Sequence, residues 1–511
     1  MNTTKLHRKH IYKTVGFPSL VTVILLAAYG LTLAPGITWA NYGVDSGDFA
    51  TAAALLGIPH PPGYPTYTIL THLFQRLPLG EPAYATNWFS ALCTAIAGGL
   101  LARLVTGALE APERFRVVLG GLTGLALGLA PLVWSQAVIT EVHGLNLLFV
   151  VLALWLARNL SDREYQIGFG SYMLALMIGL SLGNHVTIAL LLVGIGVLAI
   201  RRGWSEPQDR RKLVWLGVAL LLGSLVYLYL PLRARANPIL NWGDPKTWDR
   251  FLWTISADPY QGLAFSLPSG QIPRRIAAWA TLMREAFGYL GLVLGVVGLM
   301  YGRSKVRALD MLAMWMILVY SAFAIGYSTA DSLAYLIPAQ MGFLWLIVLG
   351  LQCVYEWIGQ RLPGHTTRVQ VGLLAIFLVS TLFGAWMDVE AVDASHDQRA
   401  IDYARNAMQQ APEGAVIMTW QALDAFPLWY VHLALGERPD LAVIVVPLLQ
   451  YDWYHDQLSL LYPDLEIPDL SILTLDDPTA PTPPEFWGRP VCFPEIQPGE
   501  EPVLELICED V

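Results

Sequence analysis

Long apolar runs recur along the first three quarters of the chain, and they constrain the fold more than any other feature. Most of them reach the roughly 17–25 residues that a helix needs to cross a bilayer. We expect eleven spans, at 15–33, 84–104, 117–134, 138–157, 168–183, 186–200, 213–231, 285–300, 311–327, 333–357 and 369–387. The sequence therefore predicts an all-α polytopic membrane protein.

The composition agrees and excludes other classes of protein. Of the 511 residues 55% are hydrophobic and 14% charged, whereas soluble domains contain about a quarter charged residues. The abundance of apolar residues excludes intrinsic disorder, and four cysteines are too few for a disulfide framework in so long a chain. The net charge of −9 offers no basic excess for nucleic acid.

The distribution of basic residues predicts the orientation of the spans. With the N-terminus in the cytoplasm, the cytoplasmic segments hold 18 lysines and arginines, and the first exterior loop holds only Arg76. Seven more lie in the long exterior loop 232–284. This bias follows the positive-inside rule. We expect a multi-pass protein of the plasma (inner) membrane whose first span is a retained signal anchor.

The segment after the last span differs from the rest of the chain. It carries four basic and 23 acidic residues, a net charge of −19. A helical pattern at 393–410 is followed by a strand at 415–419, a helix at 424–435 and a strand at 441–447. We therefore divide the chain into a transmembrane domain, 1–387, and an exterior acidic α/β domain, 388–511. For Cys492 and Cys508 a disulfide and two free thiols both remain open.

Polar residues gather on the turns that this topology places on the exterior face. Ionisable groups at membrane depth are costly, so they mark function by default. The candidates are Asp45, Asp48, His60 and Tyr64 in the first loop, Glu141 and His143, Asn184 and His185, Arg233 and Arg235 after the seventh span, and Asp331 and Tyr335. We expect Gly43 and Gly47 to let the first loop bend around Asp45, and the prolines beside His60 to stiffen the second half of this loop.

Structural interpretations compete with each of these assignments. Asp45 with Ser46 and Gly47 would also make a good turn, and Glu141 with His143 could form a local pair at a helix start. Asn184 could cap the next helix. Arg233 and Arg235 could be interfacial anchors. The tryptophans Trp242, Trp248 and Trp253 are more typical of an aromatic belt than of a sugar platform.

Several motifs together resemble the protein O-mannosyltransferase-like family of GT-C glycosyltransferases. They are Asp45-Ser46-Gly47-Asp48-Phe49 followed by His60-Pro61-Pro62-Gly63-Tyr64-Pro65, then 141–146, 183–185, 231–238, 241–244 and 438–440. The resemblance covers nearly the whole chain, and its first-loop pair is specific. Asp48 stands where the family often has Glu, which keeps the charge and shortens the reach.

The resemblance implies inverting transfer of a sugar from a polyprenyl-phosphate carrier to an exterior acceptor. We expect the sugar to be mannose and the acceptor to be Ser/Thr hydroxyls of protein. The attacking hydroxyl needs a base, and we assign Asp45, with Asp48 as partner or alternative. The leaving phosphate needs cations, and we assign Arg233 and Arg235. His60 binds the phosphate or positions the base. Tyr64, Glu141, His143, Asn184 and His185 complete the expected substrate-binding set.

Two points stay open. A divalent metal is compatible with Glu141, but the sequence shows no dense cluster of metal ligands, and no cofactor is expected. The acceptor could instead be a glycolipid or a polysaccharide.

A transporter of lipid-linked glycans would need polar groups deep inside the spans, whereas here the polar groups gather at one face. A non-catalytic scaffold would not explain acids, His60 and arginines at one depth.

Overall fold

A computed structural model of the chain describes residues 3–329, 331–465, 489–497 and 503–509. Twelve helices form the bundle: α1 (Thr3–Thr32), α4 (Pro82–Ala108), α5 (Glu113–Gly128), α6 (Pro131–Ala137), α7 (His143–Ser161), α8 (Phe169–Leu182), α9 (Ile188–Ser205), α10 (Arg210–Ser224), α14 (Ile272–Tyr301), α15 (Arg307–Gly326), α16 (Ile337–Arg361) and α17 (Thr366–Val392). Proline occupies the first turn of α4, α6 and α16, where its missing N–H costs no hydrogen bond.

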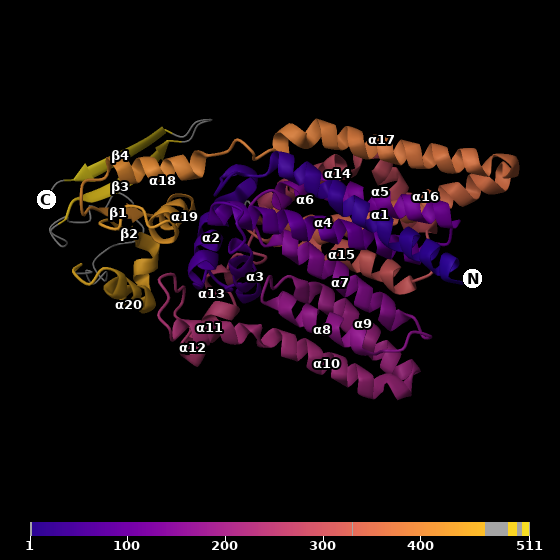
Figure 1. The fold of residues 1–511 in the computed structure, drawn as a ribbon, viewed down its shortest axis with the longest axis horizontal. Coiled ribbons are helices and arrows are strands. Elements are labelled where there is room, and N and C mark those ends of the chain that lie inside the picture. Colours follow the sequence, from indigo (N-terminus) through magenta and orange to yellow (C-terminus); the bar gives the residue numbers. More distant parts are fainter. Residues whose placement is uncertain (1–2, 330, 466–488, 498–502, 510–511) are drawn as a thin grey trace.

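Shorter helices connect them, mostly at the end of the bundle near the C-terminal residues. They are η1 (Ala40–Asp45), α2 (Ser46–Leu55), α3 (Pro65–Gln75), η2 (Pro207–Asp209), η3 (Leu225–Leu228), α11 (Tyr229–Ala234), α12 (Trp248–Ile255), α13 (Asp258–Gln261), η4 (Ser269–Gln271), η5 (Asp331–Leu336) and η6 (Pro363–His365). Figure 1 shows α2, α3 and α11 to α13 between the long helices and the C-terminal elements.

Each expected span coincides with a helical segment. Among the described residues eight helices are long and apolar enough to cross a membrane, and the pair α5 and α6, bent by 67°, makes a ninth. Two shorter apolar helices, Gly16–Thr32 and Phe169–Leu182, occupy the first and fifth expected positions. The expected fourth span begins later than predicted, at His143, because 138–142 forms the turn between α6 and α7.

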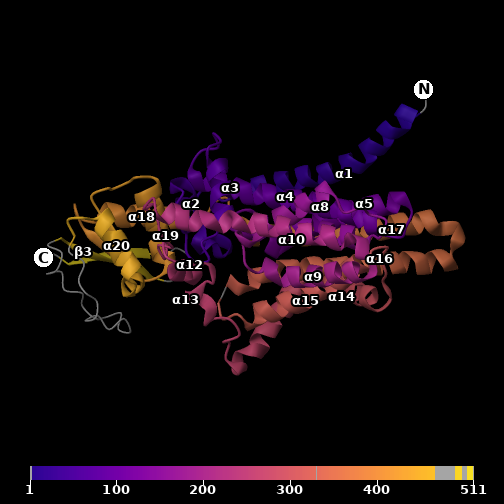
Figure 2. The same cartoon turned by 90° about the horizontal axis from the view of Figure 1, so that it is seen from below.

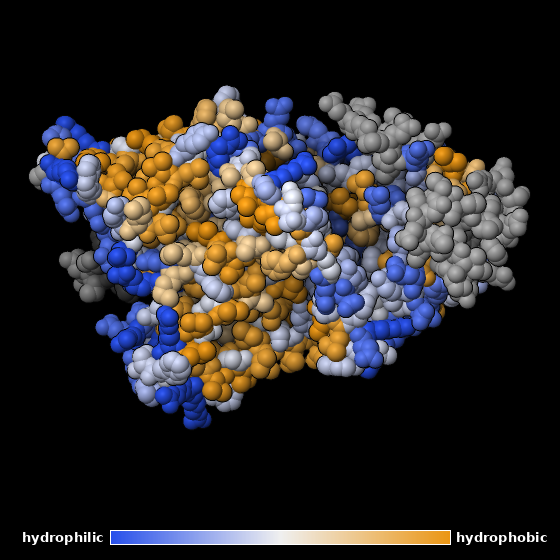
Figure 3. Space-filling view, turned by 180° about the vertical axis from the view of Figure 1, so that it is seen from behind, coloured by the Kyte–Doolittle hydropathy of each residue, from blue (hydrophilic) through white to orange (hydrophobic). Residues whose placement is uncertain are grey.

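The surface of the bundle is apolar where lipid would cover it. Figure 3 shows orange side chains over the long helices and blue ones at the end where the chain begins. On α17 large apolar side chains such as Val371, Val379 and Phe383 are more than half exposed. Exposed apolar surface of this extent is unfavourable in water and favourable against acyl chains.

Small residues let the helices of the bundle approach closely. At the crossing of α4 and α5, a Cβ atom on Gly124 would lie 2.4 Å from the carbonyl oxygen of Gly98. Without a hydrophobic force between helices in lipid, such close backbone packing is a main source of association.

The C-terminal residues form a small α/β domain, as predicted. It contains α18 (Arg399–Gln410), β1 (Val416–Thr419), α19 (Ala422–Trp429), a π-helical turn η7 (Tyr430–Ala434), β2 (Ala442–Val445), η8 (Val446–Gln450), α20 (Asp452–Leu461), β3 (Val491–Gln497) and β4 (Val503–Glu509). The sheet order is β2-β1-β3-β4, with β1 parallel to β2 and β3. Figures 1 and 2 place this domain at one end of the molecule and the N-terminus at the other.

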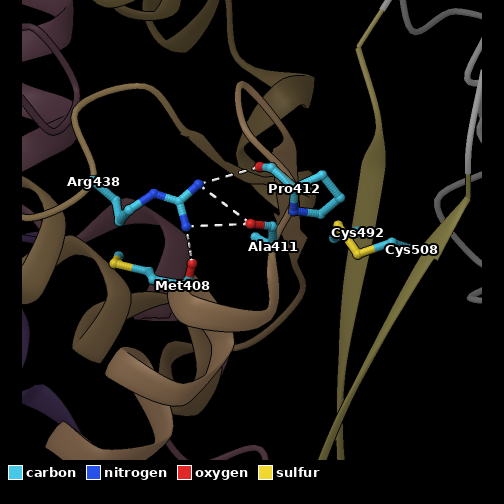
Figure 4. Close-up of a disulfide and its surroundings, with 6 residues drawn as sticks. All are labelled: Met408, Ala411, Pro412, Arg438, Cys492 and Cys508. Atoms are coloured by element: carbon cyan, nitrogen blue, oxygen red, sulfur yellow. Dashed lines mark hydrogen bonds between the residues drawn. A yellow bond between two sulfur atoms is a disulfide. The ribbon is translucent and has the colours of Figure 1, made fainter.

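The strands β3 and β4 extend the sheet beyond what the sequence pattern indicated. They pair antiparallel, and Cys492 faces Cys508 across them. The two cysteines form a disulfide, so the alternative of two free thiols does not hold (Figure 4).

In the same view Arg438 donates hydrogen bonds to the carbonyl groups of Met408, Ala411 and Pro412, at the end of α18. The motif at 438–440 thus has a structural role in this domain.

Candidate active site

The first loop between α1 and α3 is held in one conformation by contacts from the segment between α17 and α18. Asn41 and Tyr42 adopt left-handed backbone conformations, with φ of 57° and 62°. Asp397, which lies just before α18, accepts hydrogen bonds from the backbone N–H groups of Trp39 and Ala40 at 3.1 and 2.8 Å. The bend before Asp45 therefore falls on Asn41 and Tyr42, and the expectation that glycines would supply it is wrong.

Gly47 is needed for a different reason. A Cβ atom there would lie 2.4 Å from the carbonyl oxygen of Phe426. Phe426 belongs to α19, which packs on α2. The C-terminal domain therefore contacts the helix that begins directly after Asp45, and this contact requires the absence of a side chain at residue 47.

Asp48 is fully buried and has hydrogen-bond partners on both carboxylate oxygens. Its Oδ2 accepts from the backbone N–H of His60 at 3.0 Å and lies 2.7 Å from His60 Nδ1. Its Oδ1 accepts from the indole N–H of Trp242 at 3.3 Å. These bonds compensate for the desolvation of the buried carboxylate and fix the imidazole ring with Nε2 directed away from Asp48.

Asp45 lies on the other side of the same imidazole and is open to a cavity. Its Oδ2 is 3.8 Å from His60 Nε2, and 34% of its side chain is exposed. Burial raises the pKa of Asp45 to about 6, and although His60 opposes the shift, Asp331 and Asp48 add to it. A carboxylate with a pKa of about 6 is a stronger base than an ordinary aspartate, and it is largely ionised at pH 7.

His60 connects the two carboxylates. Burial alone would lower its pKa, but Asp45 and Asp48 outweigh burial, so the pKa of His60 is raised above the usual histidine value. Its ring stacks on Phe426, with 12° between the planes. The cationic imidazolium is therefore the form that this arrangement favours.

Two cavities meet at Asp45. The first, which we call the bundle cavity, has a volume of about 250 Å³. Its polar lining consists of Asn41, Tyr42, Asp45, Tyr64, Ser135, Gln136, Glu141, His143, His185, Asp331 and Tyr335. The second, the interface cavity, has a volume of about 370 Å³. It is bounded by His60, Tyr260, Thr329 and, from the C-terminal domain, Ala422 and Phe426. Both include Asp45, Tyr64, His185, Asp331 and Tyr335.

Most of the sequence-predicted residues line one or both cavities. Glu141 accepts a hydrogen bond from the backbone N–H of Val142 at 3.2 Å, and no direct bond joins it to His143 in the described structure. Burial, helped by the charges of Asp45 and Asp331, raises the pKa of Glu141 well above its usual value. Burial also lowers the pKa of His185 to about 3, so that this ring is neutral. Asn184 is buried, is not part of the lining of either cavity, and donates a hydrogen bond to the carbonyl of Val142.

The two arginines lie apart from these residues. Arg233 donates to the carbonyl oxygens of Leu55 and Leu56 at the end of α2. Arg235 is exposed. Neither is among the residues that line the two cavities.

Trp242 lies in the protein interior, so its assignment to an aromatic belt is wrong. Only 8% of the residue is exposed. Its ring contacts Phe426, Trp429 and Trp453 of the C-terminal domain. The bridge between Ile58 and Asn241 brings its loop beside the first one. Trp248, by contrast, is 70% exposed, as a belt residue would be.

Several residues of the site had no role assigned from the sequence. Asp331 and Tyr335 lie on an expected exterior turn, and that shared position is the signal that could have assigned them. Tyr260, Gln136 and Phe426 carry no such signal. Arg275 of α14 donates to Ser332 Oγ at 3.0 Å and to the carbonyl of Thr329, which lines the interface cavity.

No group of three or more His, Cys, Asp or Glu side chains that could hold a metal ion occurs among the described residues.

Comparison with known proteins confirms the resemblance to the protein O-mannosyltransferase-like family. Residues 45–208 match the family model for the protein O-mannosyl-transferase TMEM260 N-terminal domain, and residues 400–463 match TMEM260-associated domain 2. The chain is 28% identical over 456 residues to protein O-mannosyl-transferase TMEM260 of Mus musculus, covering 83% of this chain and 62% of the relative. It is 20% identical over 501 residues to the Dictyostelium discoideum protein of that name, covering 89% and 60%. The chain thus spans about three fifths of both relatives.

A solved structure confirms the GT-C-like fold. The crystal structure of ArnT from Cupriavidus metallidurans bound to undecaprenyl phosphate superposes with a TM-score of 0.61 at 14% sequence identity. The match covers 97% of this chain and 98% of the other. The arrangement of the helical bundle and the C-terminal domain is therefore shared along nearly the whole chain.

Proposed function

We propose, from the similarity to protein O-mannosyl-transferases and the geometry at Asp45, that this chain is a membrane glycosyltransferase that uses a polyprenyl-phosphate sugar. The observation that carries the proposal is the position of Asp45. This residue is a partly exposed carboxylate with a raised pKa, at the junction of two cavities. A junction of this kind lets two substrates meet at one base.

The reaction is an inverting displacement at the anomeric carbon. The acceptor oxygen forms a bond to that carbon while the bond from the carbon to the phosphate oxygen breaks, and the electron pair of that bond leaves with the carrier phosphate. The hydroxyl proton passes to Asp45 Oδ2. Because Asp45 is ionised at pH 7 and has a raised pKa, it accepts this proton more readily than an ordinary aspartate would.

Asp48 and His60 position the base. The carboxylate of Asp48 holds His60 Nδ1, so that His60 Nε2 faces Asp45 at 3.8 Å. The ring of His60 also lines the interface cavity, where its imidazolium form provides positive charge beside the reacting groups. Asp48, buried and bonded on both oxygens, is the positioning partner rather than the base.

Further positive charge for the leaving phosphate comes from arginines at this end of the bundle. Arg275 is bonded to Thr329 and to Ser332, which is next to Asp331, a residue that lines both cavities. Arg235 is exposed and keeps its role as a candidate phosphate contact, together with Arg233. A planar guanidinium suits a phosphate because it donates two parallel hydrogen bonds.

The two cavities divide between donor and acceptor. We assign the lipid-linked sugar to the bundle cavity, because a neighbouring apolar groove of about 340 Å³ shares Pro131 with it and runs between α14, α16 and α17. That groove offers a path for an acyl chain. The carboxyl of Glu141, whose pKa is raised by burial, and the amide of Gln136 can then bond sugar hydroxyls. The interface cavity, bounded by α19, receives the acceptor.

The names of the relatives support mannose as the sugar and protein as the acceptor. We assign the reaction to Ser/Thr hydroxyls of exterior protein segments. Transfer to a glycolipid or a polysaccharide is the alternative that an acceptor screen would reveal.

We further propose the topology and the domain division predicted from the sequence. The N-terminus is cytoplasmic, the protein lies in the plasma membrane, and residues 388–511 form the exterior domain. A reporter fused after Met387 is expected to read exterior, and one inserted near Arg202 is expected to read cytoplasmic. The same reading from both would contradict the topology.

Asp45→Asn tests the reaction. The purified full chain in lipid vesicles is given radiolabelled polyprenyl-phosphate mannose and a Ser/Thr-rich peptide. Asn is nearly isosteric with Asp but accepts no proton at pH 7, so the label transferred should fall by roughly 10²–10⁴.

Asp249→Asn is the matched control, since Asp249 is an exposed aspartate on α12 at the same end of the molecule. It should transfer at the wild-type rate. Normal transfer by the Asp45→Asn protein would contradict the assignment of Asp45 as the base. A wild-type protein that transfers no label would contradict the assignment of polyprenyl-phosphate mannose as the donor.

A further inference from the structure

A third polar cavity lies at the opposite end of the bundle from Asp45. It has a volume of about 380 Å³ and is formed where α4 and α7 end and α5 begins, beside α1. We call it the arginine pocket, after Arg103, Arg116 and Arg158, which line it together with Trp155, Glu113 and Phe17. The proposed reaction uses none of these residues.

The three guanidinium groups of the pocket make no ion pair with a carboxylate among the described residues, although the charge of Asp162 acts on Arg158. Within the described residues no Asp or Glu oxygen lies within 4.0 Å of them, although Glu113 is part of the lining. The lining therefore carries three positive charges and one negative charge. Like charges gathered in a cavity at the membrane boundary are unfavourable unless an anion compensates them.

The geometry leaves their N–H groups available. Arg103 and Arg158 lie over the ring of Trp155, 5.8 and 5.1 Å from its centroid, and stacking of this kind leaves the edge of a guanidinium free to donate. Arg116 donates through Nη1 to the carbonyl of Thr106 at 3.2 Å, while its buried Nε has no partner in the described structure.

The same pocket has an apolar side. Phe17 and Pro18 of α1, Ala102 of α4 and Val117 of α5 line it. Gly107 lets Arg158 lie against α4, since a Cβ atom there would be 3.0 Å from Nη2. Cationic groups beside apolar side chains at a bundle end match the two parts of a phospholipid, whose phosphate lies at the interface and whose chains enter the bilayer.

We propose that the arginine pocket binds a phosphate group, supplied either by the head group of an anionic phospholipid or by a soluble phosphate ion. This site is independent of the proposed transferase function and lies at the other end of the bundle. Arginine forks bind phosphate through paired charge-assisted hydrogen bonds, and the apolar lining favours the lipid source.

The test is native mass spectrometry of the full chain purified in detergent and titrated with phosphatidylglycerol or with zwitterionic phosphatidylcholine. The double variant Arg103→Gln/Arg158→Gln should bind phosphatidylglycerol about ten- to a hundredfold more weakly than wild type. Its binding of phosphatidylcholine should not change. Arg114→Gln is the matched control, because Arg114 is exposed on the same turn of α5 as Glu113 and lies outside the pocket.

A second arm identifies the source of the phosphate. Inorganic phosphate is added without lipid, and thermal unfolding of wild type and of the double variant is followed. Stabilisation of wild type alone, with no selective loss of phosphatidylglycerol in the variant, would assign the pocket to a soluble phosphate. Equal lipid binding and equal thermal shifts in wild type and variant would overturn the proposal. Gel filtration and transferase activity report on folding of the variant.

Discussion

Two loops at the end of the bundle beside the C-terminal domain carry residues predicted for the site, and they differ in how their side chains are used. In the first loop, Asp45, Asp48, His60 and Tyr64 form one connected cluster. In the second loop and the last turn of α11 that leads into it, Arg235 and Arg233 lie apart from the cavities. Trp242, interpreted from the sequence as a surface residue, instead donates to Asp48.

The difference lies in how each loop is held. The first loop is fixed by Asp397 and by α19, and its residues Asp45, His60 and Tyr64 line the cavities. The backbone of the second loop joins the first loop at Ile58 and Asn241. This contact directs Trp242 inward and leaves Arg235 outside. The position of a residue in the sequence therefore predicts the turn on which its side chain lies, whereas tertiary contacts decide the direction in which that side chain points.

The largest effect within this comparison is expected from Asp48→Asn. Both carboxylate oxygens of Asp48 accept hydrogen bonds, from the backbone N–H of His60 and from the indole N–H of Trp242. An asparagine amide has only one oxygen, and its N–H₂ group would face a donor, so one buried hydrogen bond is lost. Transfer should fall by roughly ten- to a hundredfold, less than for Asp45→Asn, and the free energy of unfolding by about 1–3 kcal/mol. Chemical denaturation and the transfer assay measure both. An Asp48→Asn protein of normal stability and no activity would exchange the roles of the two aspartates.

Substitutions of Arg233, in the last turn of α11, and of Arg235, directly after it, should have different effects. Arg233→Ala removes two hydrogen bonds to the end of α2 and should lower the free energy of unfolding by about 1–3 kcal/mol. Arg235→Ala should leave stability unchanged and raise the KM for the lipid donor about tenfold, as expected for loss of one charged phosphate contact.

Steady-state kinetics and thermal unfolding of both variants make this comparison. An unchanged donor KM for Arg235→Ala would leave the second loop with structural roles alone and would make the contrast between the loops complete.

The smallest effect concerns pH. The pKa of Asp45 is raised to about 6, so the base is protonated below that pH and transfer should fall about tenfold for each further unit. Asp331 is one of the charges that raise this pKa. Asp331→Asn should therefore lower the pKa of Asp45 and move the acidic limb of the rate profile to lower pH.

The neighbouring groups His60, Asp48 and Glu141 stay in place in this variant. Asp249→Asn again serves as the control, because its exposed carboxylate lies outside both cavities. A limb that does not move, or that moves to higher pH, would show that Asp45 is not the group that titrates.

The sequence by itself determined the eleven apolar helices, the β-α-β order of the C-terminal domain and the turn that carries each polar residue. These features depend on local properties, namely the length of apolar runs, hydrophobic periodicity and charge bias. Tertiary structure alone decided that Phe426 of α19 stacks on His60, that Asp331 joins Asp45 in two cavities and that Arg233 binds the end of α2. Those contacts join residues far apart in the chain, and the direction of a side chain on a loop depends on the elements that pack against that loop, which no local pattern encodes.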